Sequence, residues 1–116
     1  MAERVLCESP VLVEGGQALR FTVRVGDAQA PAFAIRYQGR VYAYVNECAH
    51  IPVELDLNPG RVFDASGQYL VCSMHGAYFS PHDGLCQGGP CRGDSLQALT
   101  VEERDGQIWL REDDDE

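Results

Sequence analysis

Apolar and polar side chains alternate along several short stretches of the chain, which is the pattern of a half-buried β-strand. The clearest stretch is Leu19–Val25, where an apolar residue occupies every second position. Ala32–Tyr37 and Val41–Val45 are rich in aromatic and β-branched residues, and they flank the turn residues Gln38-Gly39-Arg40. We therefore predict one strand at Leu19–Val25 and a β-hairpin after it.

A second hairpin is predicted near the end of the chain. Leu96–Glu102 and Gln107–Arg111 flank Asp105-Gly106, a strong signal for a tight turn between two strands. Shorter strands are predicted at Arg4–Cys7, Tyr69–Cys72 and Ala77–Phe79, and a glycine-rich loop at Cys86–Gly93. No window of about 12 residues shows helical periodicity. The pattern predicts an all-β protein, folded as an antiparallel β-sandwich or a small barrel.

Length and charge narrow the class of protein. The 116 residues suffice for one domain, 1–116, with a single modest core. The formal net charge is −9, and part of it lies in an acidic tail at 112–116. A chain this acidic repels nucleic acid and anionic lipid, so its partners should be proteins with basic patches. No apolar run reaches the roughly 18–20 residues that span a bilayer, and the first residues are too acidic for a signal peptide. A soluble, cytoplasmic protein is expected.

Two short boxes carry the candidate chemistry. The first is Cys48-Ala49-His50 and the second is Cys72-Ser73-Met74-His75, with 21 residues between them. Each box offers one thiol and one imidazole, and each follows a predicted strand. Two loops that leave strands in this way can face each other and combine four ligands in one site.

Ligand type and spacing limit the metal. Thiolates and imidazoles bind both zinc and iron. A structural zinc site usually takes its cysteines as one C-x2–4-C pair and its histidines as one H-x3–5-H pair, whereas each box here mixes the two residue types. Mixed boxes favour a diiron cluster with cysteines on one iron and histidines on the other. A zinc-stabilised interaction module without a redox role stays as an alternative.

The paired boxes resemble the signature of the Rieske 2Fe–2S proteins. The resemblance covers roughly residues 4–111 and includes further matches at Phe79, Asp83-Gly84, Gly89-Pro90 and Leu96–Val101. It implies a β-sandwich of three antiparallel sheets with a small cluster-binding subdomain at about 46–85. It also implies the roles of the ligands: Cys48 and Cys72 would hold the inner iron of one 2Fe–2S cluster. His50 and His75 would hold the outer iron, near the surface.

Three cysteines and one histidine remain outside the boxes. Cys7 is expected to be a small buried residue of a strand, and His82 an ordinary surface residue of a turn. The disulfide that clamps the cluster loops in Rieske proteins of respiratory cytochrome bc complexes has no counterpart, because Met74 stands at one of its box positions and Pro52 or Val53 at the other. Cys86 and Cys91 are expected to be reduced thiols lining a loop, with a local disulfide as the alternative.

The residues after the second box bear on the reduction potential. High-potential members of the family that the chain resembles have Ser directly after His-Gly and Tyr two positions later, and both donate hydrogen bonds to cluster sulfurs. This chain has Ala77 and Phe79 there. Tyr78 lies between them and should point to the opposite side of a strand. Fewer donors destabilise the reduced cluster, so we expect a low potential, toward the roughly −150 mV end of the Rieske range.

The sequence offers no catalytic site beyond the cluster. Of its three histidines the cluster would take two, and the remaining His82 cannot build the two-His, one-carboxylate iron site of an oxygenase. No G-x-G-x-x-G motif is present for a flavin or nicotinamide. The resemblance implies a one-electron carrier and not an enzyme, working between a flavin-dependent reductase and a terminal oxygenase of the aromatic-ring dioxygenase type. The small Rieske subunit of a nitrite reductase complex is the alternative.

The same resemblance implies where the partners dock. His50 and His75 would provide the exit path for the electron, and Ile51, Pro52 and Met74 a dry contact patch around them. Because the chain is acidic, salt should slow electron transfer to a basic partner.

Overall fold

The computed structural model describes residues 2–25, 28–46, 61–64, 66–72, 77–88 and 95–112. These residues form an antiparallel β structure, as the hydrophobic pattern predicted. The strands are β1 (Ala2–Glu8), β2 (Leu19–Val25), β3 (Ala28–Tyr37), β4 (Arg40–Val45), β5 (Leu70–Val71), β6 (Tyr78–Phe79), β7 (Cys86–Gly88), β8 (Ala98–Arg104) and β9 (Gln107–Glu112). A single 3-10 turn, η1 (Ser9–Val11), follows β1.

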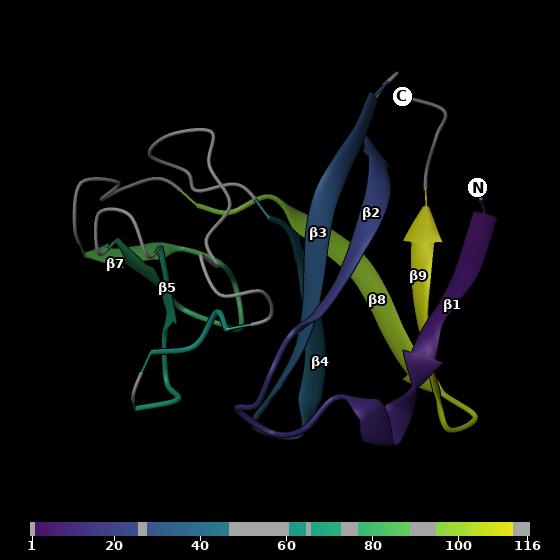
Figure 1. Cartoon of the computed structure of the whole chain (residues 1–116), viewed down its shortest axis with the longest axis horizontal. Helices are drawn as coiled ribbons and strands as arrows, with labels where there is room; N and C mark the ends of the chain where they lie inside the picture. Colours follow the sequence, from purple (N-terminus) through teal and green to yellow (C-terminus); the bar gives the residue numbers. More distant parts are fainter. Residues whose placement is uncertain are drawn as a thin grey trace.

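The strands form a large sheet and a small one. The large sheet has six strands in the order β1-β9-β8-β4-β3-β2, and the small sheet has the order β5-β6-β7. In Figure 1 the small sheet lies to the left of the large sheet, and β8 runs between β4 and β9. Because β8 pairs with both, the large sheet consists of two halves that share this strand. These two halves and the small sheet correspond to the three antiparallel sheets expected from the sequence.

Strands β3 and β4 lie at the centre of the molecule and are buried on both faces. Ala32, Ala34 and Ala43 pack on one face with Ile108 and Leu110 of β9. Phe33, Ile35 and Tyr44 pack on the other face with the small sheet. This double burial explains why the Ala32–Ile35 segment is apolar at every position and does not alternate.

The two edges of the large sheet are joined by one arginine. Arg4 on β1 donates a hydrogen bond of 2.6 Å to the backbone carbonyl of Thr22 on β2. Its guanidinium carbon lies 5.9 Å from the ring centroid of Phe21. The sheet is therefore curled until its two edge strands meet, and a carbonyl that would otherwise be open on the β2 edge has a donor.

Both predicted hairpins are present, and their turns explain why. Gln38 and Gly39 have φ angles of 51° and 79°, and Asp105 and Gly106 have φ angles of 55° and 74°. Two consecutive residues with positive φ make the type I′ turn, whose twist matches that of two antiparallel strands. The turn residues therefore fix the register of each hairpin.

Strand β3 begins at Ala28, four residues before the predicted start, and includes Pro31. The Pro31 carbonyl accepts a hydrogen bond of 2.8 Å from the backbone N–H of Asn46. In an antiparallel ladder the nitrogen and carbonyl of one residue face the same neighbour, so the Pro31 nitrogen also faces this point. It has no proton to donate, and the β3–β4 ladder ends here. Pro31 thus lies opposite the point where the chain leaves β4 toward the first box.

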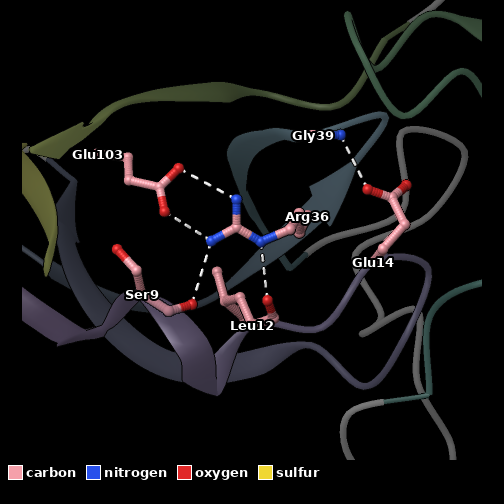
Figure 2. Close-up of polar contacts among 6 residues, drawn as sticks. All are labelled: Ser9, Leu12, Glu14, Arg36, Gly39 and Glu103. Carbon is pink, nitrogen blue, oxygen red and sulfur yellow. Dashed lines mark hydrogen bonds and ion pairs between the residues drawn. The ribbon is translucent and has the colours of Figure 1, made fainter. Parts of the chain in front are cut away.

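A half-buried arginine fastens the segment after β1 to the sheet (Figure 2). Arg36 on β3 donates hydrogen bonds to the backbone carbonyls of Leu12 (2.8 Å) and Ser9 (3.1 Å). The same guanidinium makes a two-bond ion pair with Glu103 on β8, at 3.0 and 2.7 Å. Such a planar, paired geometry is the strong form of an ion pair. It joins β3, β8 and the 3-10 turn at one point.

The first hairpin turn has a carboxylate cap. Glu14 accepts hydrogen bonds from the backbone N–H groups of Gln38 (2.5 Å) and Gly39 (2.8 Å). Figure 2 shows the bond from Gly39 to Glu14, beside the Arg36 pair. Both polar contacts therefore hold residues 9–14 against the large sheet.

Candidate metal centre

The second box begins inside the small sheet. Strands β5 and β6 pair as a short hairpin, with Leu70 opposite Phe79 and Val71 opposite Tyr78. Cys72 follows β5, and its backbone N–H donates a hydrogen bond of 2.7 Å to the carbonyl of Ala77. This bond joins the two described residues that flank positions 73–76. The second box therefore lies between two paired strands, and His75 lies outside the described residues.

The first box follows the end of β4. Val45 is the last residue of this strand, and Asn46 is buried, with 1% of its surface exposed. Cys48 and His50 come next and lie outside the described residues. Of the four predicted ligands the structure thus describes Cys72 alone. Among the residues that the structure describes, no group of three His, Cys, Asp or Glu side chains could hold a metal ion. The ligand set stays a prediction.

The surroundings of Cys72 fit an iron ligand. Its side chain is fully buried, and its thiol is free of any disulfide. It belongs to the core cluster between the large sheet and the small sheet, whose other members include Phe33, Ile35, Leu70 and Phe79. A free thiol at the end of a strand can bind soft iron as a thiolate. Apolar neighbours around such a site keep water away and disfavour added negative charge.

The residues after the second box lie as predicted. Ala77 and Phe79 are fully buried, whereas Tyr78 between them is 39% exposed. The Tyr78 ring meets the ring of Tyr69 edge to face, with centroids 5.3 Å apart. The one hydroxyl in this segment of three residues therefore points away from the buried side of the sheet.

A turn of residues 80–84 follows β6 and is held by a tyrosine that the sequence interpretation missed. The hydroxyl of Tyr44 on β4 donates a hydrogen bond of 2.6 Å to the carbonyl of Pro81. Burial, together with the nearby negative charge of Asp83, raises the pKa of this phenol far above its usual range, so the hydroxyl keeps its proton. Nothing in the sequence links residues 37 positions apart, because a lone tyrosine in a strand usually serves the core.

His82 is a surface residue, as predicted. Its side chain is 60% exposed. Nδ1 lies 2.7 Å from the Ser80 hydroxyl, and Nε2 lies 3.5 Å from an Asp83 carboxylate oxygen. These contacts belong to the turn itself, so His82 has no role as a ligand in the described structure.

Two expectations for the end of the small sheet are wrong. Cys86–Gly88 is strand β7 and not part of a loop. It pairs with β6, with Tyr78 opposite Gly88 and Phe79 opposite Cys86. A strand of three residues that includes glycine shows no hydrophobic alternation in the sequence. Strand β7 forms because it pairs with β6. A Cβ atom at Gly88 would overlap the Tyr78 ring, which explains the glycine there.

The second error concerns the cysteine on this strand. Cys86 is not a reduced thiol lining a loop, because it is disulfide-bonded. Only 5% of its surface is exposed, and it packs in the same core cluster as Cys72. Pairing with β6 places Cys86 opposite Phe79, on the side of the small sheet that faces the core. Cys7 on β1 is half-buried and free, and burial is the main reason that its thiol pKa is raised.

In the described part of the chain no helix is long and apolar enough to cross a membrane. A family model described as the Rieske [2Fe-2S] domain matches residues 4–103. A comparison with curated protein sequences gave no significant match.

Several solved structures are similar to this chain over nearly its whole length. One is the ferredoxin of carbazole 1,9a-dioxygenase from Nocardioides aromaticivorans IC177, with a TM-score of 0.73, 21% identity, and coverage of 97% of this chain and 100% of that chain. Another comes from a complex of reduced oxygenase and oxidized ferredoxin in carbazole 1,9a-dioxygenase, with a TM-score of 0.72, 21% identity, and coverage of 97% and 94%. At these identities the structures show a shared fold.

A third match is to a longer chain. It comes from a complex of carbazole-bound oxygenase and ferredoxin of carbazole 1,9a-dioxygenase, with a TM-score of 0.76 and 16% identity. The similarity covers 97% of this chain but 29% of that one. The same fold therefore also occurs as a part of a longer chain.

Proposed function

The chain belongs to the Rieske [2Fe-2S] domain family, and from this premise we propose that it is a one-electron carrier of Rieske ferredoxin type. A Rieske-type 2Fe–2S cluster is its cofactor. The carrier takes an electron from a flavin-dependent reductase and delivers it to a terminal oxygenase of the aromatic-ring dioxygenase type, with no catalysis of its own. The observation that carries this proposal is that the similarity spans 100% of the chain of a separate ferredoxin, that of carbazole 1,9a-dioxygenase.

We further propose that the four residues of the two boxes hold the cluster. Cys48 and Cys72 bind the inner iron, and His50 and His75 bind the outer iron. The buried, free thiol of Cys72 at the end of β5 supports this assignment. The cluster-binding subdomain, at about 46–85, and the cytoplasmic location stay predictions.

The cluster supplies the redox chemistry, and the chain sets its potential. Ala77 and Phe79 are fully buried and have no hydroxyl, and the hydroxyl of Tyr78 points away from them. Without these donors the extra negative charge of the reduced cluster is less stabilised. A low-potential carrier follows, which suits delivery of electrons to an oxygenase.

A redox titration of the purified protein tests this function. We expect a red-brown protein with an EPR signal when reduced and a midpoint toward the roughly −150 mV end of the Rieske range. Ala77→Ser and Phe79→Tyr should each raise the midpoint, because each adds a donor on the buried side of β6. Tyr78→Phe is the matched control and should leave it unchanged. A wild-type midpoint above about +100 mV would contradict a low-potential carrier.

The proposed partners follow from charge. With a net charge of −9 the carrier should meet basic surfaces, and added salt should slow the transfer of its electron. Ile51, Pro52 and Met74, the predicted contact residues, lie outside the described part of the chain. Isolation of the chain in a stable complex with a reductase that reduces nitrite would favour the alternative function. The family match favours the iron cluster over zinc.

A further inference from the structure

We propose that Tyr44 is a positioning residue of the cluster site, and that its hydroxyl holds the turn of residues 80–84 in place against strand β4. This inference rests on the proposed function, because it concerns how firmly the chain holds the cluster. Tyr44 itself does not belong to the predicted ligand set. It acts through the turn of residues 80–84.

The hydrogen bond of Tyr44 joins the two sheets. Tyr44 lies on β4 of the large sheet and is 1% exposed. Its hydroxyl lies 2.6 Å from the carbonyl of Pro81, which follows strand β6 of the small sheet after Ser80. In the described part of the chain no other donor reaches this carbonyl. A buried carbonyl without a donor is costly, so the bond favours one position of the turn.

The turn is built to fit against the ring of Tyr44. The Gly84 N–H donates a 2.7 Å hydrogen bond to the Ser80 carbonyl, and the Gly84 carbonyl accepts one of 2.9 Å from Leu96. Gly84 has a φ of 73°, and a Cβ there would lie 2.8 Å from Cε1 of Tyr44. Glycine is thus required both by the backbone conformation and by the close approach of the ring.

The same residue also links the elements that lie next to the two boxes in the chain. Tyr44 is followed by Val45, the last residue of β4, and then by Asn46, two positions before Cys48 of the first box. The turn that it holds comes directly after β6, whose partner β5 leads into Cys72. One side chain therefore ties the strand before the first box to the hairpin that carries the second. A cluster bound by both boxes is held more firmly when their distance is fixed.

The hydroxyl can be tested apart from the ring. The ring of Tyr44 packs against Phe33, with centroids 5.9 Å apart, and Phe at position 44 would keep this contact. Tyr42, two positions earlier on the same strand, also borders this core cluster and provides the matched control. Tyr44→Phe removes the donor to Pro81, whereas Tyr42→Phe removes a hydroxyl for which the described residues show no hydrogen bond.

The experiment measures loss of the cluster from the full-length, cluster-loaded protein. An iron chelator is added to the wild type and to the two variants, and the decay of visible absorbance is followed. Redox titration and urea unfolding are run on the same samples. We expect Tyr44→Phe to lose its cluster about tenfold faster than the wild type, the factor that one unpaired buried carbonyl would give. Its midpoint potential should rise, because a looser turn admits water that stabilises the reduced cluster.

The outcomes separate this inference from the proposed function. If Tyr44→Phe and Tyr42→Phe lose the cluster equally fast and share one midpoint, the inference is wrong while the carrier function stands. The same holds if Tyr44→Phe lowers only the stability to urea, since that would be a structural role alone. If the wild type holds no cluster after reconstitution with iron and sulfide, the proposed function fails and the inference fails with it.

Discussion

The two sheets of this protein are stabilised in different ways. The large sheet has strands of six to ten residues, whereas the strands of the small sheet have two or three. Long ladders, two type I′ turns and the Arg36–Glu103 pair hold the large sheet. A pair of two-residue strands is not stable by itself in water. The small sheet must therefore take its stability from outside.

Its described contacts with the rest of the chain are few and specific. The Val71 N–H donates to the carbonyl of Val62 at 2.8 Å, and Tyr44 donates to Pro81 at 2.6 Å. Further support comes from the 2.9 Å hydrogen bond of the Leu96 N–H to the Gly84 carbonyl, from the disulfide of Cys86 and from the shared apolar core, which includes Cys72. From this difference between the two sheets we expect the large sheet to be a scaffold that folds without the cluster. We expect the small sheet to depend on both the scaffold and the cluster.

Replacing Cys72 should have the largest effect and should separate the two sheets. In Cys72→Ser the cluster would lose a proposed inner-iron ligand, so visible absorbance and the EPR signal should disappear completely. Hydrogen exchange should show lost protection in β5 and β6 and retained protection in β2, β3, β8 and β9, because only the small sheet needs the cluster.

The half-buried Cys7 provides the matched control for this change. Its thiol is free and lies on β1 of the large sheet, away from the predicted ligands. Cys7→Ser should keep the full cluster spectrum. Equal loss of protection in both sheets of Cys72→Ser would show that the large sheet also requires the cluster, and the comparison would then fail.

The same difference between the sheets decides what the sequence could predict. Both hairpins of the large sheet were predicted because local turn residues, Gln38-Gly39 and Asp105-Gly106, set them. Leu19–Val25 was predicted with its correct bounds because one face of it is buried and its residues alternate. The predicted start of β3 was four residues too late. Proline usually interrupts a strand, and the sequence does not show that the β3–β4 ladder ends beside Pro31.

The small sheet was predicted less well because its strands, of two or three residues, are too short to show a hydrophobic pattern. Strand β7 has no pattern of its own and exists through its pairing with β6, so Cys86 was placed on a loop and taken as reduced. The outward position of Tyr78 was predicted, since it follows from the alternation of side chains on any strand. The Tyr44–Pro81 bond was not, because no local rule joins residues 37 positions apart. The ligand boxes were found by spacing, and Cys72 is the one predicted ligand among the described residues.

Removing the Arg36 guanidinium should lower the stability of the large sheet and leave the cluster in place. In Arg36→Met two backbone carbonyls and the Glu103 carboxylate lose their donor, and the Arg36 side chain is only 16% exposed. We expect the free energy of unfolding to fall by about 2–3 kcal/mol in a urea titration. Arg40→Met, at an exposed position on β4, is the control and should change it by no more than about 0.5 kcal/mol. An altered cluster spectrum in folded Arg36→Met would show that the two sheets are coupled through the scaffold.

The smallest expected effect is a pH dependence that belongs to the large sheet. The hydrogen bonds from Arg36 and its positive charge lower the pKa of Glu103 below its ordinary value of 4.5. A carboxyl with a lower pKa in the folded state contributes stability that is fully present above the unfolded pKa, and it loses this contribution as the pH falls through the folded value. Unfolding of wild type by urea should therefore become easier as the pH drops below about 4.5, and Glu103→Gln should weaken this dependence.

Glu102→Gln is the control for this change, since Glu102 lies on the same strand with 55% of its side chain exposed. The variant should keep the acid dependence of the wild type. Because the carboxylate of Glu103 binds an arginine of the scaffold, the change should move global unfolding and not the rate at which the cluster is lost at neutral pH. A cluster-loss rate that changed at neutral pH in Glu103→Gln would mean that the small sheet responds to the Arg36 pair, and the division between a self-sufficient scaffold and a dependent cluster site would have to be given up.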